Sequence, residues 1–191
     1  MVNPGYTLMK SAMTYGAILG IILAVIEFLM FVFNVLPVGY MQFALIIVTI
    51  ASYYIGIYFS TKKIRTTVFN GNLTYQQGVM TGTLVAAFAA VISGFYTYLQ
   101  NTVLDPNYVT RLVEAQKAWF LTLGNQLDKN VIDNSIKLLD DGLKNYDALI
   151  DFYNSIFLYI FLGVILSLIT SAYLKRKTAS TNVNQESHSQ I

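Results

Sequence analysis

The chain has 191 residues, of which 55% are hydrophobic and 12% are charged, and its formal net charge is +2. This composition is too apolar for an ordinary soluble domain and indicates a protein that lies in a lipid bilayer. The chain contains no cysteine and its only histidine, His188, lies in a polar tail, which excludes disulfides, thiolate nucleophiles and cysteine-based metal sites.

Four apolar segments are each long enough to cross a bilayer, which takes roughly 20 residues. They cover residues 11–35, 40–60, 75–99 and 152–174. The first follows Lys10, but it is about twice as long as the apolar region of a signal peptide, so we interpret it as a spanning helix. The sequence therefore predicts an all-α membrane protein, with four transmembrane helices in one compact bundle over residues 1–177.

The connections between the first three segments are short. Pro37 and Gly39 lie in a link of only a few residues, which predicts a tight turn and an antiparallel pair of helices. The sequence Asn70-Gly71-Asn72 predicts a second turn, after which the hydroxyl of Thr74 is placed to cap the third helix.

Each apolar segment carries small residues at helical spacing. Lipid tails are as apolar as leucine, so membrane helices associate through close backbone approach, and small residues are expected at their contacts. We interpret these stripes as the packing faces of the bundle, with a homodimer through the GxxxG motif of the third segment as the alternative. The glycines concerned are Gly16, Gly20, Gly56, Gly78, Gly82 and Gly163.

Glu27 is the only charged residue well inside a predicted span. A carboxylate there costs at least a few kcal/mol, so something should offset it. One interpretation is functional: a proton or ion site, or a contact to a buried ligand. The other, which the residues favour, is a protonated carboxyl hydrogen-bonded to a tyrosine, a serine or a backbone carbonyl of a neighbouring helix, because proton-coupled transporters usually carry more than one ionisable group in their spans.

The polar insert at 101–151 is predicted to form a helical hairpin with one apolar face. Asp105 and Pro106 resemble a helix start. Trp119 and Phe120 are candidates for contact with the membrane interface or a partner, although the hairpin's own core is favoured for both. On the opposite face, two pairs of charges are spaced i to i+4 and are expected to form solvated ion pairs. These pairs are Asp133 with Lys137 and Asp140 with Lys144.

Basic residues gather in the connections on one side of the predicted bundle. They are Lys10, Lys62, Lys63, Arg65, Lys175, Arg176 and Lys177. The insert instead carries five basic and eight acidic residues. The positive-inside bias then predicts cytoplasmic termini and an outward-facing insert, which in a bacterium means the inner membrane with the insert in the periplasm. The tail at 178–191, rich in serine, asparagine and glutamine, is predicted to be disordered.

Known catalytic and nucleotide-binding motifs are missing from the sequence, and the basic residues are too sparse for a nucleic-acid surface. We therefore expect no cofactor and no metal, and a non-enzymatic accessory, scaffold or interaction protein. Its expected partners are the lipid bilayer and either a second copy or another membrane protein. The alternative is a small transporter or channel subunit that uses Glu27 as an intramembrane proton or ion site.

The order of these features resembles a known family of membrane proteins. The helix pair with its short link is followed by a basic loop that ends in Asn70-Gly71-Asn72-Leu73-Thr74-Tyr75-Gln76-Gln77-Gly78, by a small-residue span with Gly82, and by Asp105-Pro106. Over about residues 8 to 176 this is similar to the uncharacterised domain family 4199 of Bacteroidetes integral membrane proteins, although Asn72 departs from the family's glycine pair. The resemblance implies a four-helix inner-membrane protein and no catalytic residues.

Overall fold

The computed structural model describes residues 4–124 and 126–175, and all the elements in this part of the chain are helices. Its helices are α1 (Pro4–Val32), α2 (Tyr40–Thr67), α3 (Tyr75–Leu99), the π-helical segment η1 (Gln100–Leu104), α4 (Tyr108–Thr122), α5 (Lys129–Lys144) and α6 (Ala148–Leu174). The predicted all-α class is confirmed. The predicted disordered tail at 178–191, His188 and the basic residues Arg176 and Lys177 lie outside the described residues.

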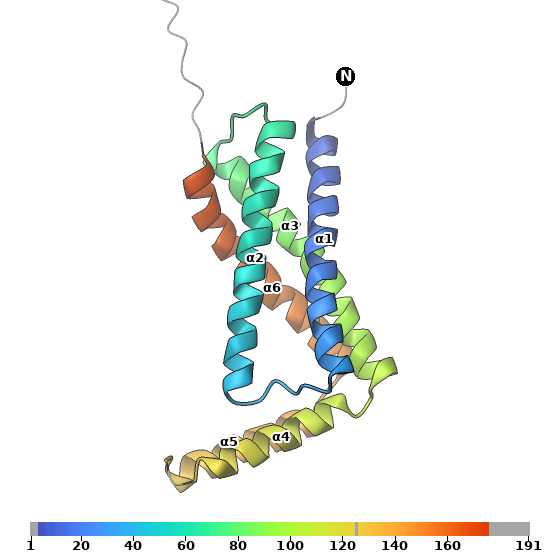
Figure 1. The fold of residues 1–191 in the computed structure, drawn as a ribbon, viewed down its shortest axis with the longest axis vertical. Helices are drawn as coiled ribbons and strands as arrows, with labels where there is room; N and C mark the ends of the chain where they lie inside the picture. The colour runs from blue at the N-terminus through green and yellow to red at the C-terminus, as the bar shows by residue number, and fades with distance from the viewer. Residues whose placement is uncertain (1–3, 125, 176–191) are drawn as a thin grey trace, which may run out of the picture.

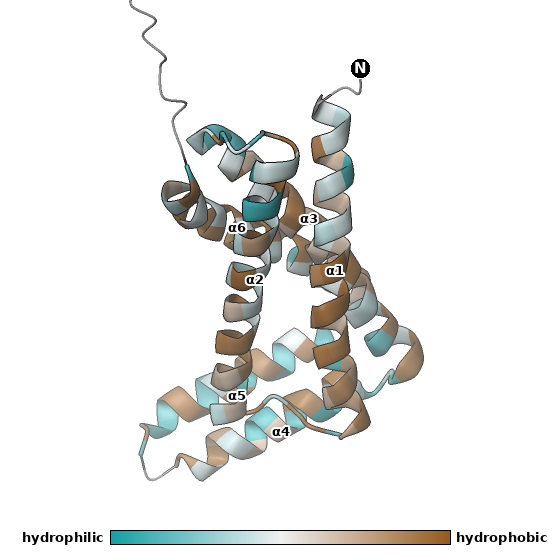
Figure 2. Cartoon of the chain, turned by 45° about the horizontal axis from the view of Figure 1, so that its top comes forward, coloured by the Kyte–Doolittle hydropathy of each residue, from teal (hydrophilic) through white to brown (hydrophobic). Residues whose placement is uncertain are grey.

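Four of the helices are long and apolar enough to cross a membrane: α1, α2, α3 with η1, and α6. Each has at least 27 residues and is therefore roughly 40 Å long, more than the roughly 30 Å of bilayer hydrocarbon. The start of α1, the α2–α3 turn and the end of α6 lie at one end of the bundle (Figure 1). We call it the basic end, because its charged residues are Lys10, Lys62, Lys63, Arg65 and Lys175. The opposite end is the hairpin end, and apolar residues dominate between the two (Figure 2).

The central helix of the bundle is α3, which packs mainly against α1 and α6. Half of its most apolar window is buried inside the protein, against 17% to 28% for the other three spans. Small side chains allow this approach: a Cβ added to Gly16 would lie 2.5 Å from Phe88 Cβ, and one on Gly163 would overlap with Ala86. Gly20 meets Ile92 of α3 in the same way, and Gly56 of α2 makes a similarly close contact with Leu19 of α1.

The GxxxG motif of α3 is used inside the bundle. Gly78 faces Ser171 and Gly82 faces Ser167, both on α6 of the same chain. A homodimer through this face would compete with α6, which already occupies it, and the small-residue stripes lie at helix contacts within one bundle.

The first helix ends three residues earlier than predicted, at Val32. Asn34 adopts a left-handed backbone conformation with φ 51°, and the amide of Val35 donates to the Met30 carbonyl at 2.8 Å. This is a Schellman motif, in which asparagine is one of the few residues that tolerates the left-handed position. The link to α2 consequently covers residues 33–39, which allows α2 to begin at a distance from α1.

The turn and the cap predicted before the third helix are both confirmed. Asn70 and Gly71 have positive φ angles of 50° and 86°. The Thr74 hydroxyl accepts a hydrogen bond from the Gln77 amide, and the Gln77 side chain accepts one from the Thr74 amide, which together form a capping box.

Removing this cap should destabilise α3. Thr74→Ala leaves the amides of the first turn without their acceptor, so we expect a loss of about 1 kcal/mol in the free energy of unfolding. Thermal unfolding of the purified protein measures this loss of stability. Thr74→Ser keeps the hydroxyl and should stay within a few tenths of a kcal/mol of the wild type; equal losses in both variants would contradict the role of the cap.

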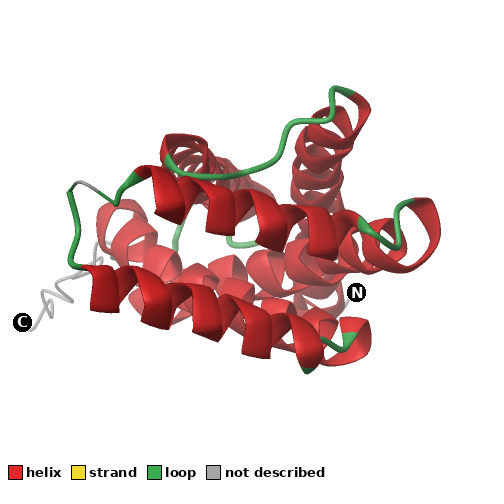
Figure 3. Cartoon of the chain, turned by 90° about the horizontal axis from the view of Figure 1, so that it is seen from below, coloured by secondary structure: helices red, strands yellow, loops and turns green. Residues whose placement is uncertain are grey.

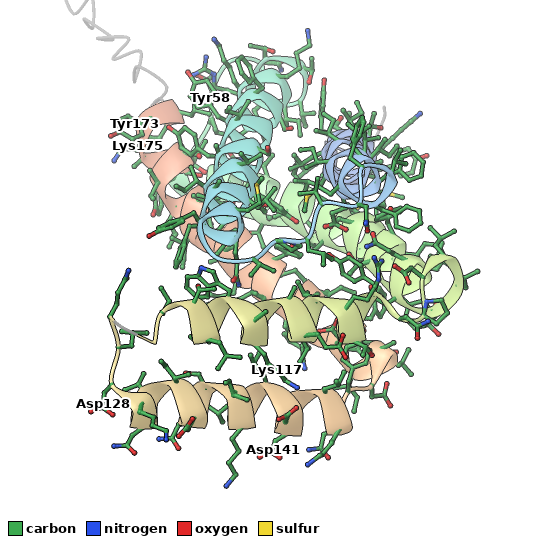
Figure 4. The ribbon with its side chains drawn as sticks, turned by 60° about the horizontal axis from the view of Figure 1, so that its bottom comes forward. Tyr58, Lys117, Asp128, Asp141, Tyr173 and Lys175 are labelled. Carbon is green, nitrogen blue, oxygen red and sulfur yellow. The ribbon has the colours of Figure 1, made fainter. Side chains whose placement is uncertain are left out.

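The insert forms the predicted helical hairpin. Its two helices, α4 and α5, lie side by side across the end of the bundle (Figure 3). Val113 and Ile132 are buried. Lys117 lies between the two helices (Figure 4) and forms an ion pair with Asp140 of α5. The predicted pair of Asp140 with Lys144 is therefore wrong, because Asp140 pairs with Lys117 of α4 instead.

Two further details of the insert differ from the predictions. Lys144 lies 3.9 Å from Asp141, and no ion pair joins Asp133 to Lys137 within the described residues. The helix start predicted at Asp105 is also wrong: α4 begins at Tyr108, and the Asp105 carboxylate pairs with Arg111. An arginine one turn into the helix competes successfully for a carboxylate that would otherwise cap it.

Candidate functional site

A cavity of about 550 Å³ lies in the half of the bundle next to the hairpin. All four spans line it, together with the α1–α2 link, η1 and the first residue of α4. Most of its wall is apolar, contributed by residues such as Ile26, Leu45, Ile50 and Leu162. A smaller part is polar and includes Glu27, so the charged residue of the first span faces a cavity and not a dry helix contact.

The cavity exists because α2 separates from the other spans at this end. From Tyr40 to Ile50 no residue of α2 is buried, whereas five residues from Tyr53 to Ile64 are. Gly56, which permits close contact with Leu19 of α1, lies in the packed half only. Without small residues at the contact, the larger side chains of the first three turns of α2 keep the helices apart.

Glu27 is held by the neighbouring helix α3. The Thr97 hydroxyl donates to Glu27 Oε2 at 2.8 Å, with the Ser93 carbonyl as an alternative acceptor at 3.2 Å. Glu27 takes part in none of the ion pairs among the described residues. Its second oxygen therefore remains available to a molecule in the cavity.

Further polar groups line the cavity around this carboxyl. They are Gln42 and Thr49 on α2, Ser93 on α3, Gln100 of η1, Tyr108 on α4 and Tyr159 on α6. Tyr108 is half-buried, and burial raises the pKa of its hydroxyl, with the negative charge of Glu27 as the next contribution. The phenol therefore stays neutral at physiological pH and keeps a proton to donate.

Two stacked tyrosines lie beside the cavity. Tyr159 of α6 stacks on Tyr53 of α2, with ring centroids 5.6 Å apart. Tyr53 is fully buried, and the stacked pair belongs to the packed core of the bundle.

The hairpin is attached to the bundle next to the cavity. Arg111 of α4 donates to Asn34 Oδ1 at 2.8 Å, which ties α4 to the end of α1. The indole of Trp119 lies against Gly39, where a Cβ would be 2.6 Å from the ring nitrogen. Gly39 has a φ of 58°, so both its conformation and its contact with Trp119 require glycine.

The candidate residues of the sequence analysis are thus divided between three places. Glu27 faces the cavity, and the six glycines lie at helix contacts. Trp119 packs on the α1–α2 link, outside the hairpin core favoured from the sequence, and Phe120 contacts the Trp119 ring at 5.2 Å between centroids. The sequence analysis did not identify the polar wall, although Ser93 and Thr97 continue the small-residue stripe of α3 to the depth of Glu27.

The carboxyl, amide and hydroxyl groups of this wall are suited to hydrogen bonding. Among the described residues, no three histidine, cysteine or acidic side chains are grouped as a metal site would require. The fold and the site together define an integral membrane protein with four spans, a polar patch inside a mainly apolar cavity and an amphipathic hairpin beside it.

The chain belongs to the family described as "Protein of unknown function (DUF4199)", whose model it matches over residues 14–176. The match covers the hairpin, three of the spans in full and α1 from residue 14 onward, and it confirms the family resemblance. Neither a curated protein nor a solved structure matches the chain.

Proposed function

We propose that this protein is a non-enzymatic membrane protein that binds a small amphiphilic molecule in the cavity, with Glu27 as its polar anchor. The observation that carries the proposal is the cavity of about 550 Å³ with a carboxyl group in its wall. Ligand sites are typically mainly apolar cavities of this size with a few polar groups that orient the ligand.

The lining determines the chemistry of the ligand. The apolar wall suits an alkyl or aromatic portion, and Glu27 offers a carboxylate oxygen with no cationic partner among the described residues. A head group that is basic, or that donates hydrogen bonds, fits this oxygen because a charge-assisted hydrogen bond is about twice as strong as a neutral one. Gln100 and Tyr108 add polar contacts on the same side.

Binding can be tested by purifying the protein in native-lipid particles and identifying small molecules that remain bound, by mass spectrometry. We expect one class of amphiphile to be enriched over the surrounding lipid. Thr49→Phe fills the cavity from α2 and should lower this enrichment at least tenfold. Val48→Phe, which adds the same volume at a neighbouring exposed position outside the cavity, should not. Equal enrichment in all three proteins would refute the proposal.

The second candidate function is a small transporter or channel subunit that uses Glu27 as a proton or ion site. An ionisable group beside a cavity favours it. Toward the basic end the helices are packed around the buried Tyr53, so passage to that end would require this core to open. Proton flux into proteoliposomes that is lost in Glu27→Gln would favour transport over binding alone.

We further propose that the basic end is cytoplasmic and the hairpin periplasmic, in the inner membrane of a bacterium such as a member of the Bacteroidetes. The positive-inside bias supports this orientation. Because the chain lacks cysteine, single cysteines report it cleanly. In intact cells, a membrane-impermeant maleimide should label Asn134→Cys of α5, and Asn72→Cys only after permeabilisation. The reverse pattern would invert the orientation.

A further inference from the structure

A second groove lies between α1 and α2, in the half of the bundle next to the basic end. Its volume is about 640 Å³. Ile18, Ile22 and Ile55 form its apolar wall, and Lys62 and Lys63 stand at its end. The three isoleucines are about half exposed on the surface of two spanning helices, so the groove opens toward the hydrocarbon of the bilayer.

The charges at this end are of one sign. Every acidic residue in the described part of the chain is either Glu27 or lies between 105 and 151, in or next to the hairpin. Arg65 is engaged, since it donates to the Leu174 carbonyl at 3.2 Å. Lys62 and Lys63 take part in no ion pair among the described residues, and the Lys62 ammonium lies 5.9 Å from the centroid of the Tyr58 ring.

We propose that this groove binds an anionic phospholipid, with one acyl chain along the apolar wall and its phosphate at Lys62 and Lys63. The location supports a lipid as the occupant, because an apolar groove at hydrocarbon depth continues directly into a pair of lysines at headgroup depth. The single sign of the charge favours an anionic lipid, since no acidic side chain among the described residues lies at this end to attract the cationic part of a zwitterionic headgroup.

Native mass spectrometry of the full chain with equal amounts of phosphatidylglycerol and phosphatidylcholine tests the proposal. We expect at least one phosphatidylglycerol to be retained in preference. Lys62→Gln with Lys63→Gln should weaken its retention about 25-fold, at about fivefold for each lysine. Lys10→Gln with Lys175→Gln removes the same charge from the same end outside the groove, and should change retention less than twofold.

The apolar wall has its own matched pair of variants. Ile22→Trp fills the groove and should lower phosphatidylglycerol retention, whereas Ile21→Trp adds the same side chain at a neighbouring exposed position that does not line it. Equal retention of the two lipids, equal effects of the two lysine pairs, or displacement of the bound species by inorganic phosphate would each overturn a lipid site in this groove.

Discussion

Glu27→Gln should weaken ligand binding by roughly ten- to a hundredfold while the protein stays folded. Glutamine has nearly the same shape and still offers an oxygen to the Thr97 hydroxyl, but it lacks the charge that anchors a basic or proton-donating head group. Hydrogen bonds to charged groups contribute about 1.5–3 kcal/mol, which corresponds to this range. Titration of the identified amphiphile against the two proteins measures the change in affinity.

The stability of the same variant separates ligand binding from a structural role. A carboxyl in a span costs a few kcal/mol, so Glu27→Gln should unfold at the same temperature as the wild type or above it. Thr97→Val removes the hydrogen bond to Glu27 and leaves the charge, so it should weaken binding less than Glu27→Gln does. If Glu27→Gln lowers thermal stability and leaves ligand affinity unchanged, the carboxyl is only a structural contact.

Gly163→Val should produce the largest loss of stability of any variant considered. A Cβ at this position overlaps with Ala86 of α3, and the contact between α3 and α6 lies in the centre of the bundle. Overpacking of this kind typically costs about 1–3 kcal/mol, and here the added side chain would meet a neighbouring helix directly. We expect a much reduced yield of folded protein and a lower unfolding temperature in detergent.

Gly142→Ala provides the matched control. Gly142 lies on α5, and a Cβ there meets nothing within 4 Å. Alanine is the better helix former, so this variant should gain about 0.5–1 kcal/mol. Wild-type stability in Gly163→Val would show that α3 and α6 are not in close contact and would contradict the packing of the bundle.

Patterns that depend on one segment at a time could be read from the sequence. Apolar length alone identifies the four spans, and the capping box at Thr74 is local to one helix start. The glycine stripes predict close contacts between helices, but they do not specify which helix is the partner. This is why Gly78 and Gly82 permitted a dimer, whereas α6 of the same chain fills their face.

The site depends on the placement of helices relative to one another, and only one of its residues could be predicted. Glu27 could be identified from the sequence, because a charged residue inside a membrane span is energetically unfavourable and therefore rare. The cavity beside it follows from the separation of α2 over Tyr40 to Ile50, which no local pattern specifies. Ion pairs could not be predicted for the same reason. The i to i+4 spacing of Asp140 and Lys144 favours a pair within α5, but Asp140 pairs with Lys117 of the neighbouring helix α4.

Photochemical capture inside living cells tests ligand binding at Glu27 most directly. A photoreactive phenylalanine analogue at Ile46 faces the cavity, and the same group at Ile47, which is more exposed and outside the cavity, samples the surrounding lipid. We expect position 46 to capture one amphiphile that position 47 does not, and its yield to fall at least tenfold in a Glu27→Gln background. Capture of the same bulk lipids at both positions, unchanged by Glu27→Gln, would contradict a binding site at Glu27.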